Sequence, residues 1–235
     1  MKNSVRYFDL NFIKKEEISK DVSVLYFDRK NIDLNFSAGQ YLHLYLPVEN
    51  ENGRGDSRMF TIASSPMEKD YIFIAVKKGR SLFKKTLFSL REGTSVKFYG
   101  PSGGLVLNDA ASGGKKPSYV FLSLGIGITP FRSIIKYISQ KNLMVPITLI
   151  ASFSRKEDFL FLSELMEISS ANPCINVIYS SNRINANLIK KNVVSINSHF
   201  YFIVGSPAGV ADLEEVVSGM GVASDKVFIE DFEGY

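Results

Sequence analysis

Apolar residues in the first half of the chain fall into short runs, or alternate with other residues, as they do in β-strands. Val22, Val24 and Tyr26 alternate in this way. Further runs of strand length lie at 41–46, 71–76 and 96–99. One segment, roughly Ser81 to Leu90, instead spaces its apolar residues as a helix does. Many short strands with little helix predict an antiparallel barrel or sandwich.

The second half of the chain has a different rhythm, in which strand patterns alternate with helical patterns. The predicted strand–helix pairs are 119–124 with 130–140, 147–153 with 159–169, 175–179 with 185–191, and 201–204 with 208–220, before a last strand at 226–229. Alternation of this kind predicts a parallel sheet with helices on both faces.

A small, polar and glycine-rich stretch, NDAASGGKKP at 108–117, separates the two patterns. Such a composition is typical of a connection between domains. The sequence therefore predicts a β-barrel domain over 1–108, a linker over 109–117 and an α/β domain over 118–235.

The sequence GIGITP at 125–130 joins the first predicted strand of the second domain to its helix. Gly125 and Gly127 let the backbone approach an anion, and the first-turn N–H groups and the helix dipole favour negative charge there. Thr129 and Pro130 open the helix, where proline loses no useful donor. Pro130 also stands where the fingerprint G-x-G-x-x-G has its third glycine. The segment predicts an anion cradle, with a tight turn that binds nothing as the alternative.

Composition and charge narrow the classes of function. The net charge of +4 comes with 24 acidic residues, which does not indicate a nucleic-acid partner. Cys174 is the single cysteine, which excludes an intrachain disulfide, a four-cysteine iron–sulfur site and a zinc site built on thiolates. His43 and His199 lack ligand spacing, so no metal site is expected. The polar N-terminus and the lack of a long apolar run predict a cytoplasmic protein without a membrane span.

A local cluster of basic residues stands out against this mild net charge. It consists of Lys77, Lys78, Arg80, Lys84 and Lys85. A solvated rim is one interpretation. The other is a surface that binds a ligand phosphate or an acidic carrier protein.

The segment RMFTIAS at 58–64 combines three side chains that could hold three parts of one ligand. Arg58 could clamp a phosphate. Phe60 could pack on a ring or a ribose, and Thr61 could hydrogen-bond a polar ring edge. An ordinary strand with one exposed arginine is the alternative.

Six motifs in one order resemble the ferredoxin–NADP reductase superfamily of flavin-dependent pyridine-nucleotide oxidoreductases, over nearly the full chain. The motifs are RMFTIAS at 58–64, GPSG at 100–103, GIGITP at 125–130, SRKEDF at 154–159, GSP at 205–207 and EDFEGY at 230–235. The resemblance implies a flavin-binding barrel followed by a nucleotide-binding α/β domain. It implies FAD as cofactor and NADPH or NADH as hydride donor.

The resemblance also assigns roles in the flavin site. Arg58 would clamp the FAD pyrophosphate, Phe60 would stack beside the flavin and Thr61 would lie near its N5 atom, with Met59 in the same segment. Residues that would edge the cofactor or the hydride path are Ala75, Val76, Lys77, Ser64 and Glu230. Tyr235 would cover the flavin face and yield to nicotinamide, with an unattached chain end as the alternative.

Several positions depart from the family's commonest pattern. Phe60 replaces a tyrosine, and Val204 stands where relatives often have a cysteine. Ser81 and Lys84 belong to an S-x-F-K variant in which Lys84 would supply the anion contact. Leu124 stands where a glycine often precedes the pyrophosphate loop.

The same resemblance implies how a nicotinamide dinucleotide would bind. Gly125, Gly127, Thr129 and Pro130 would seat its pyrophosphate, and Gly205 and Pro207 would lie near the nicotinamide. Residues suited to a 2′-phosphate after the second strand are Ser152, Ser154, Arg155 and Lys156, which favours NADPH. NADH stays open, because relatives that use NADH also often carry an arginine here.

Electrons would then pass to another molecule, because the chain has too few cysteines for a cluster. The candidate acceptors are a ferredoxin, a flavodoxin, an oxygenase component or a small oxidant. Two rival functions stay open: a reductase that uses free flavin as substrate, and a non-catalytic electron-transfer or redox-sensing subunit.

Overall fold

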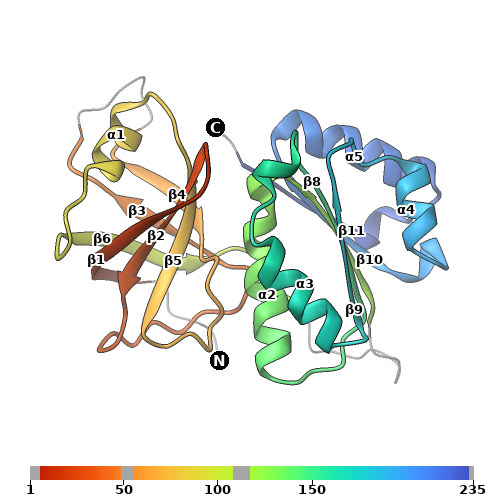
Figure 1. The fold of residues 1–235 in the computed structure, drawn as a ribbon, viewed down its shortest axis with the longest axis horizontal. Coiled ribbons are helices and arrows are strands. Elements are labelled where there is room, and N and C mark those ends of the chain that lie inside the picture. The colour runs from red at the N-terminus through yellow and green to blue at the C-terminus, as the bar shows by residue number, and fades with distance from the viewer. Residues whose placement is uncertain (1–5, 49–54, 108–116, 233–235) are drawn as a thin grey trace.

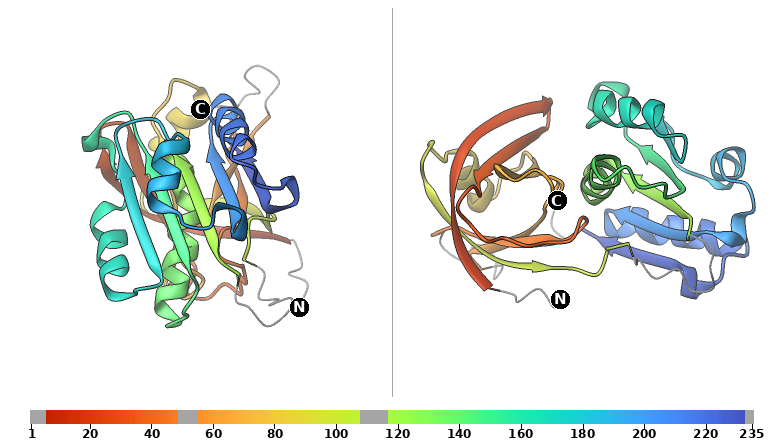
Figure 2. Two further views of the ribbon diagram at one scale, coloured as in Figure 1. Left: turned by 90° about the vertical axis from the view of Figure 1, so that its right-hand side faces the viewer. Right: turned by 90° about the horizontal axis from the view of Figure 1, so that it is seen from below.

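The computed structural model describes residues 6–48, 55–107 and 117–232. Six strands form an antiparallel sheet in the order β4-β3-β6-β1-β2-β5. They are β1 (Arg6–Ser19), β2 (Val22–Asp28), β3 (Tyr41–Tyr45), β4 (Ser57–Thr61), β5 (Tyr71–Lys77) and β6 (Ser95–Ser102). The sheet curves round on itself (Figure 2), and the Ala63 N–H donates to the Phe73 carbonyl at 2.9 Å between the two edge strands. The predicted barrel is confirmed.

The barrel interior is built by alternation along its strands. Leu42 and Leu44 of β3 are fully buried, while the residues beside them are partly exposed. The helix α1 (Leu82–Phe88) adds Phe83 and Leu87 to the same core. Ser81 caps this helix, since its hydroxyl accepts the Lys84 N–H at 3.3 Å.

Five strands form a second, parallel sheet in the order β11-β10-β7-β8-β9. They are β7 (Tyr119–Leu124), β8 (Ile147–Ser152), β9 (Ile175–Ser180), β10 (Phe200–Gly205) and β11 (Val227–Asp231). The helices between them are α2 (Thr129–Gln140), α3 (Leu162–Ala171), α4 (Ala186–Asn192) and α5 (Pro207–Gly219). Figure 1 shows this domain beside the barrel. The predicted parallel sheet is confirmed.

Helices cover both faces of the parallel sheet because both faces are apolar. On β7, Phe121 packs with residues of α2 and α3, while its neighbour Leu122 packs with residues of α4 and α5. A strand buried on both sides reads as a continuous apolar run. This is why the run at 119–124 was recognisable in the sequence.

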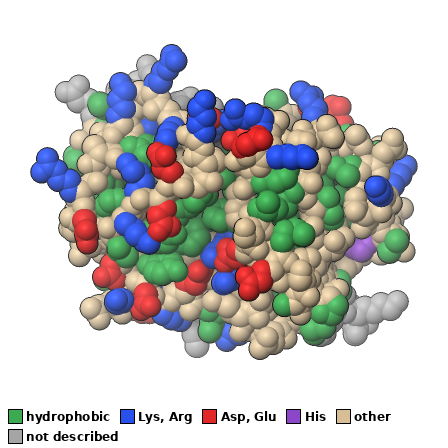
Figure 3. Space-filling model, viewed as in Figure 1, with side chains coloured by type: hydrophobic (Ala, Val, Ile, Leu, Met, Phe, Trp, Pro, Cys, Tyr) green, Lys and Arg blue, Asp and Glu red, His purple; other side chains and the backbone are tan. Residues whose placement is uncertain are grey.

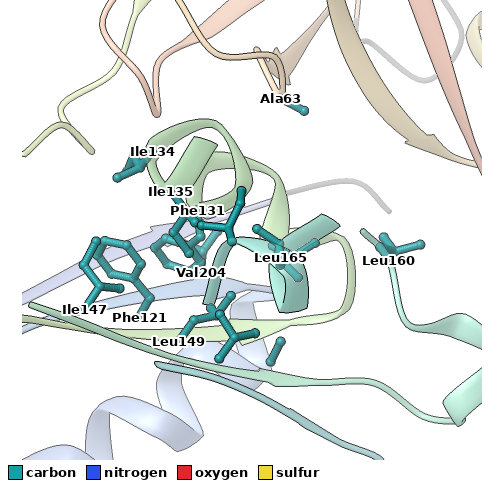
Figure 4. Packing of buried hydrophobic residues seen from close by; sticks show 14 of the residues in the cluster. Ala63, Phe121, Phe131, Ile134, Ile135, Ile147, Leu149, Leu160, Leu165 and Val204 are labelled. Carbon is teal, nitrogen blue, oxygen red and sulfur yellow. The ribbon is translucent and has the colours of Figure 1, made fainter. Parts of the chain in front are cut away.

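The helix α2 lies between the two domains (Figures 1 and 2). Phe131 and Ile134 of α2 share one hydrophobic cluster with the barrel residues Val22, Ala63 and Phe73. Figure 4 shows Ala63 on the barrel side, above the α2 residues. The second domain therefore packs on the barrel through the helix that follows the glycine loop.

The strand β1 is the element that the sequence analysis did not name. Phe8, Leu10 and Phe12 are buried and alternate with exposed residues, which is the signal that could have found it. From Lys14 onward the strand is largely exposed and polar, because it extends along β2 beyond the barrel core. The pattern of apolar residues therefore does not indicate that the strand continues beyond Lys14.

The predicted linker at 109–117 lies outside the described residues apart from Pro117, and the domain boundaries stay a prediction. None of the helices in the described ranges has both the length and the apolar character that a membrane crossing requires. Within the same ranges, no group of three or more histidine, cysteine or acidic residues is placed to hold a metal ion.

Candidate functional site

A cavity of about 1210 Å³ opens where the barrel strands β3 and β4, the start of α1 and the edge strand β11 come together. It brings together most of the residues predicted for the flavin site. These are Arg58, Met59, Phe60, Thr61, Lys77, Ser81, Lys84 and Glu230. We refer to it as cavity 1. Residues of three of the six motifs, those at 58–64, 100–103 and 230–235, therefore meet in this cavity.

Arg58 is held in place at cavity 1 by its own neighbourhood. Its guanidinium donates to the carbonyls of Gly55 at 3.1 Å and Ser57 at 2.6 Å. The same group lies 4.9 Å from the centre of the Phe83 ring, in a cation–π contact. The Phe60 ring stacks on Phe83 from the barrel side at 6.3 Å. An arginine fixed in this way is preorganised to receive an anion.

The lysines of cavity 1 also favour an anionic ligand. Burial lowers the pKa of Lys84, and the neighbouring charge of Lys77 lowers it further. The Lys84 side chain folds over Gly79, where an added Cβ would meet its Cδ at 2.6 Å. A negative group between these two ammonium ions would relieve their repulsion. Cavity 1 therefore suits a phosphate-bearing ligand.

Glu230 places a carboxyl group in the same cavity from β11, where it pairs with Val204 of β10. Burial raises the pKa of Glu230 to about 7, and the charge of Asp231 adds to the effect. The side chain can therefore hold a proton near neutral pH. A protonated carboxyl can donate a hydrogen bond or release a proton at the cavity wall.

A second cavity of about 570 Å³, cavity 2, lies at the carboxyl ends of the parallel strands. It is lined by Gly125 of the glycine loop, by Ser152 and Gly205 at the ends of β8 and β10, and by Asp21 from the barrel. Lys77 and Phe232 line both cavities, so the two adjoin. Ligand crevices of open α/β sheets form at this edge.

The glycine loop of the predicted anion cradle is a short 3-10 turn, Gly125–Ile128, that runs into α2. Gly125 has a φ of +56°, and an added Cβ there would point into open space. A Cβ on Gly127 would instead collide with the Val204 carbonyl. The Thr129 hydroxyl donates to the Ile126 carbonyl at 3.0 Å. Gly125 thus borders cavity 2, while Gly127 and Thr129 shape the turn behind it.

Leu124, which departs from the family pattern, has a structural explanation. An added Cβ on Gly205 would meet Leu124 atoms at 2.6 Å, and one on Gly209 would collide with its Cδ1. The leucine side chain therefore fills space that these two glycines leave free. It lines cavity 2 at the same time.

The segment predicted for a 2′-phosphate is only partly brought to cavity 2. Ser152 and Ser154 line it, but Arg155 and Lys156 do not. Arg155 turns instead to Asp158, which it binds at 2.9 Å. The Ser152 hydroxyl donates to the Asn182 carbonyl at 2.9 Å and so fixes the loop after β9.

That loop supplies a residue that sequence reasoning missed. Arg183 lines cavity 2, its side chain is 94% exposed, and its guanidinium lies 3.8 Å from the Asp212 carboxylate. Ser181 and Asn182 line the cavity beside it. The polar run SSNR at 180–183 follows a predicted strand, so the same rule that pointed to 152–156 could have found it.

Five further predicted residues line neither cavity among the described residues: Ser64, Ala75, Val76, Pro130 and Pro207. Ser64 is fully buried, and its hydroxyl accepts the Phe73 N–H at 3.3 Å. Ala75 and Val76 are buried in the hydrophobic cores. The predicted contact at Tyr235 lies outside the described residues.

An ion-pair cluster that the sequence analysis did not predict joins the two domains. Arg132 of α2 donates to Glu68 of the barrel and to Glu164 of α3, at 2.6 and 2.7 Å. Its side chain is 5% exposed. Charged side chains of both signs gather between the domains in Figure 3. Arg132 lies two residues after the GIGITP segment, and no local pattern in the sequence indicates its acidic partners.

The chain matches two protein-family models in succession. Residues 9–106 match an oxidoreductase FAD-binding domain, and residues 121–207 match an oxidoreductase NAD-binding domain. The first match covers the barrel and the second covers most of the α/β domain. Residues of both matched regions line cavity 2, whereas cavity 1 is lined by the FAD-binding region and by residues 227–232, which follow the second match.

Curated relatives and solved structures agree with these matches. A flavohemoprotein of Bacillus subtilis is 25% identical over 237 residues, covering 93% of this chain and 57% of that protein. An NADPH oxidoreductase of Mycobacterium tuberculosis is 26% identical over 207 residues, covering 84% and 52%. This chain therefore spans little more than half the length of these relatives. The Plasmodium falciparum ferredoxin–NADP⁺ reductase has the same fold, with a TM-score of 0.79, 16% identity and 96% coverage of each chain.

Proposed function

Since the chain belongs to the ferredoxin–NADP reductase superfamily of FAD- and NAD(P)H-dependent oxidoreductases, we propose that it oxidises NADPH and passes the electrons to a separate acceptor. The observation that carries this proposal is that cavities 1 and 2 adjoin, with Lys77 and Phe232 in the walls of both. A flavin held in one cavity and a nicotinamide held in the other would meet at that shared wall.

The residues of cavity 1 fit FAD. Its pyrophosphate would bind Arg58, and Lys84 would supply a second cationic contact whose pKa is lowered by burial and by Lys77 until an anion arrives. Phe60 and Thr61 line the adjoining wall, where the isoalloxazine ring would rest. Ser81 would act through the helix cap that holds Lys84 in place.

The residues of cavity 2 fit a nicotinamide dinucleotide. Gly125 would let the pyrophosphate approach the backbone, and Gly127, Thr129 and Pro130 would keep the turn in shape behind it. Gly205 lines the cavity at the neighbouring strand end, and Pro207 begins the helix beside it.

A preference for NADPH over NADH rests on Arg183. Its guanidinium is exposed at cavity 2 next to Ser181, where it could bind a 2′-phosphate in a charge-assisted contact. Arg155 is a weaker candidate than its position in the sequence indicated, because it is paired with Asp158. Ser152 would support the site by fixing the loop that carries Arg183.

When bound, the two cofactors would supply the hydride-transfer chemistry. The part of the chain would be to align the two rings and to keep water away from them. Glu230 lies at cavity 1 in a protonation state that can change near neutral pH. Ser64 would serve this site through its backbone, since its hydroxyl is occupied by the Phe73 N–H.

The acceptor would be a separate molecule, such as a carrier protein, an oxygenase component or a small oxidant. Two features support a protein acceptor. Basic residues border cavity 1, among them Lys78 and Arg80. Met59 and Ile229 are 54% and 52% exposed at the same opening. An acidic partner with an apolar centre would complement such a rim.

Anaerobic titration of the purified protein with NADPH and with NADH tests the proposal, with flavin absorbance as the readout. We expect one FAD per chain and loss of flavin absorbance with NADPH at lower concentration than with NADH. Bound FAD that neither nucleotide bleaches would refute the oxidoreductase function. A colourless protein that reduces added FMN would instead support the free-flavin reductase.

A further inference from the structure

Two consecutive residues of α2 bind two consecutive carbonyl groups of the barrel. The Arg132 Nη1 atom donates to the Ala63 carbonyl at 3.0 Å, and the Ser133 hydroxyl donates to the Ser64 carbonyl at 2.7 Å. These donors follow the glycine loop of cavity 2 within one helical turn. The two acceptors follow Thr61 of cavity 1 within three residues. These two hydrogen bonds therefore connect the helix that follows the glycine loop to the chain segment that follows Thr61.

The barrel segment that receives these bonds is also fixed from its other side. The N–H groups of Ile62 and Ala63 donate to the carbonyls of Gln40 and Phe73, both at 2.9 Å. The Ser64 hydroxyl accepts the Phe73 N–H. The segment thus lies between two rigid supports, β5 and α2. A shift of α2 would have to move it or break these bonds.

Arg132 is oriented by more contacts than a simple domain contact needs. Each of its partners Glu68 and Glu164 binds it through both carboxylate oxygens, at 2.6–3.2 Å and 2.7–2.8 Å. Its guanidinium also lies 4.7 Å from the centre of the Phe73 ring. Glu68 in turn accepts the Ser65 N–H at 2.5 Å. Bidentate pairs fix geometry as well as charge.

We propose that Arg132 and Ser133 are positioning residues that set the distance between the nicotinamide-binding loop and the flavin-binding segment at Thr61. The inference rests on the proposed function. Neither residue lines cavity 1 or cavity 2, so neither would contact a cofactor there. Their effect would be on ring alignment, and displacement of reacting groups by about 1 Å can slow a reaction about a hundredfold.

The test compares Arg132→Met, Arg132→Lys and Ser133→Ala with the control Lys136→Met in the purified, FAD-loaded protein. Lys136 is a matched control, because its ammonium binds the same Glu164 carboxylate at 3.0 Å and that ion pair stays within the second domain. Three quantities are measured: bound FAD and the NADPH concentration for half-saturation, the anaerobic rate of flavin bleaching at saturating NADPH, and hydrogen exchange at residues 61–65.

We expect Arg132→Met to slow bleaching at saturation by about ten- to a hundredfold, while FAD content and half-saturation stay within about twofold. Ser133→Ala would show a smaller slowing in the same direction. Exchange at the amides of Ile62 and Ala63 would speed up in both variants, since the carbonyl contacts that brace the segment are lost. Lys136→Met would match the unmodified protein in all three measurements.

Wild-type bleaching and wild-type exchange in FAD-loaded Ser133→Ala and Arg132→Lys would overturn the proposal, whether or not Arg132→Met folds. So would a lower melting temperature with an unchanged bleaching rate, because the contacts would then be purely structural. If the unmodified protein is not bleached by either nucleotide, the proposed function fails instead. In that case the exchange data decide alone, and faster exchange at Ile62 and Ala63 would still support the bracing of this segment.

Discussion

Arg132 and Glu68 form an almost fully buried ion pair across the two domains, with side chains 5% and 12% exposed and an N–O distance of 2.6 Å. Removing one partner of such a pair leaves an uncompensated charge away from water. The stability of the domain junction therefore depends on both members of this pair.

The stability of the domain junction should depend on pH through Glu164, the second partner of Arg132. Burial alone would raise the pKa of Glu164, but hydrogen bonds from Arg132 and Lys136 outweigh it and hold the pKa below 4.5. The folded protein therefore gains stability from this carboxylate above pH 4.5 and loses it as the pH falls through the lowered pKa. We expect the melting temperature to fall over that range, by about 2–4 °C per kcal/mol lost. Glu164→Gln should have a lower melting temperature at pH 7, and its melting temperature should fall less steeply as the pH is lowered below 4.5.

Glu230 should make stability depend on pH in the opposite direction. Its folded pKa is raised by burial, and by Asp231, to about 7 from 4.5. The folded state therefore binds a proton more tightly than the unfolded state does, and stability falls as the pH rises from about 4.5 to about 7. Glu230→Gln should remove this fall. Melting curves from pH 4 to pH 8 for the two proteins check it, and parallel curves would contradict the assignment.

Arg58→Ala should lose FAD. The variant removes a charge-assisted contact of about 1.5–3 kcal/mol, which corresponds to about ten- to a hundredfold weaker binding. Absorbance of the purified protein gives the FAD content per chain. Arg91, on the loop after α1, is exposed and lies outside the lining of cavity 1, so Arg91→Ala is the control. Stoichiometric FAD in folded Arg58→Ala would count against the clamp.

Arg183→Ala should weaken the binding of NADPH more than the binding of NADH. The guanidinium is exposed and only loosely paired with Asp212, so its removal should not disturb the fold. We expect the half-saturating concentration of NADPH to rise about tenfold, with NADH unchanged. Arg155→Ala serves as the comparison, because Arg155 is bound to Asp158. If only Arg155→Ala lost the preference for NADPH over NADH, the 2′-phosphate would instead be assigned to the segment after β8.

The fold could be predicted from the sequence because each domain has its own pattern of apolar residues. Alternation along β3 and the double-sided apolar run of β7 both follow from which faces of a strand are buried. The second half of strand β1 carried no such signal, because it is polar and exposed, although the first half alternates. Apolar periodicity reveals the parts of a strand that face a core, and it is silent about the rest.

Only some residues of the candidate site could be predicted from the sequence. Residues within short motifs, such as Arg58 and Gly125, lie at the cavities because a motif is itself a local structure. Arg183 was missed because it belongs to no such motif. Arg132 was missed because its role depends on two carboxylates 32 and 64 residues away, and no local pattern carries that information.

Leu124 and Gly209 form a complementary pair of a bulky side chain and an empty position at the edge of cavity 2. Shortening the leucine would enlarge the cavity beside Gly205 and Gly209. Under the proposed function, that added space would be available to a synthetic nicotinamide analogue with an added alkyl group. The contact that accounts for an unusual residue is thus also a position at which the choice of cofactor could be changed by design.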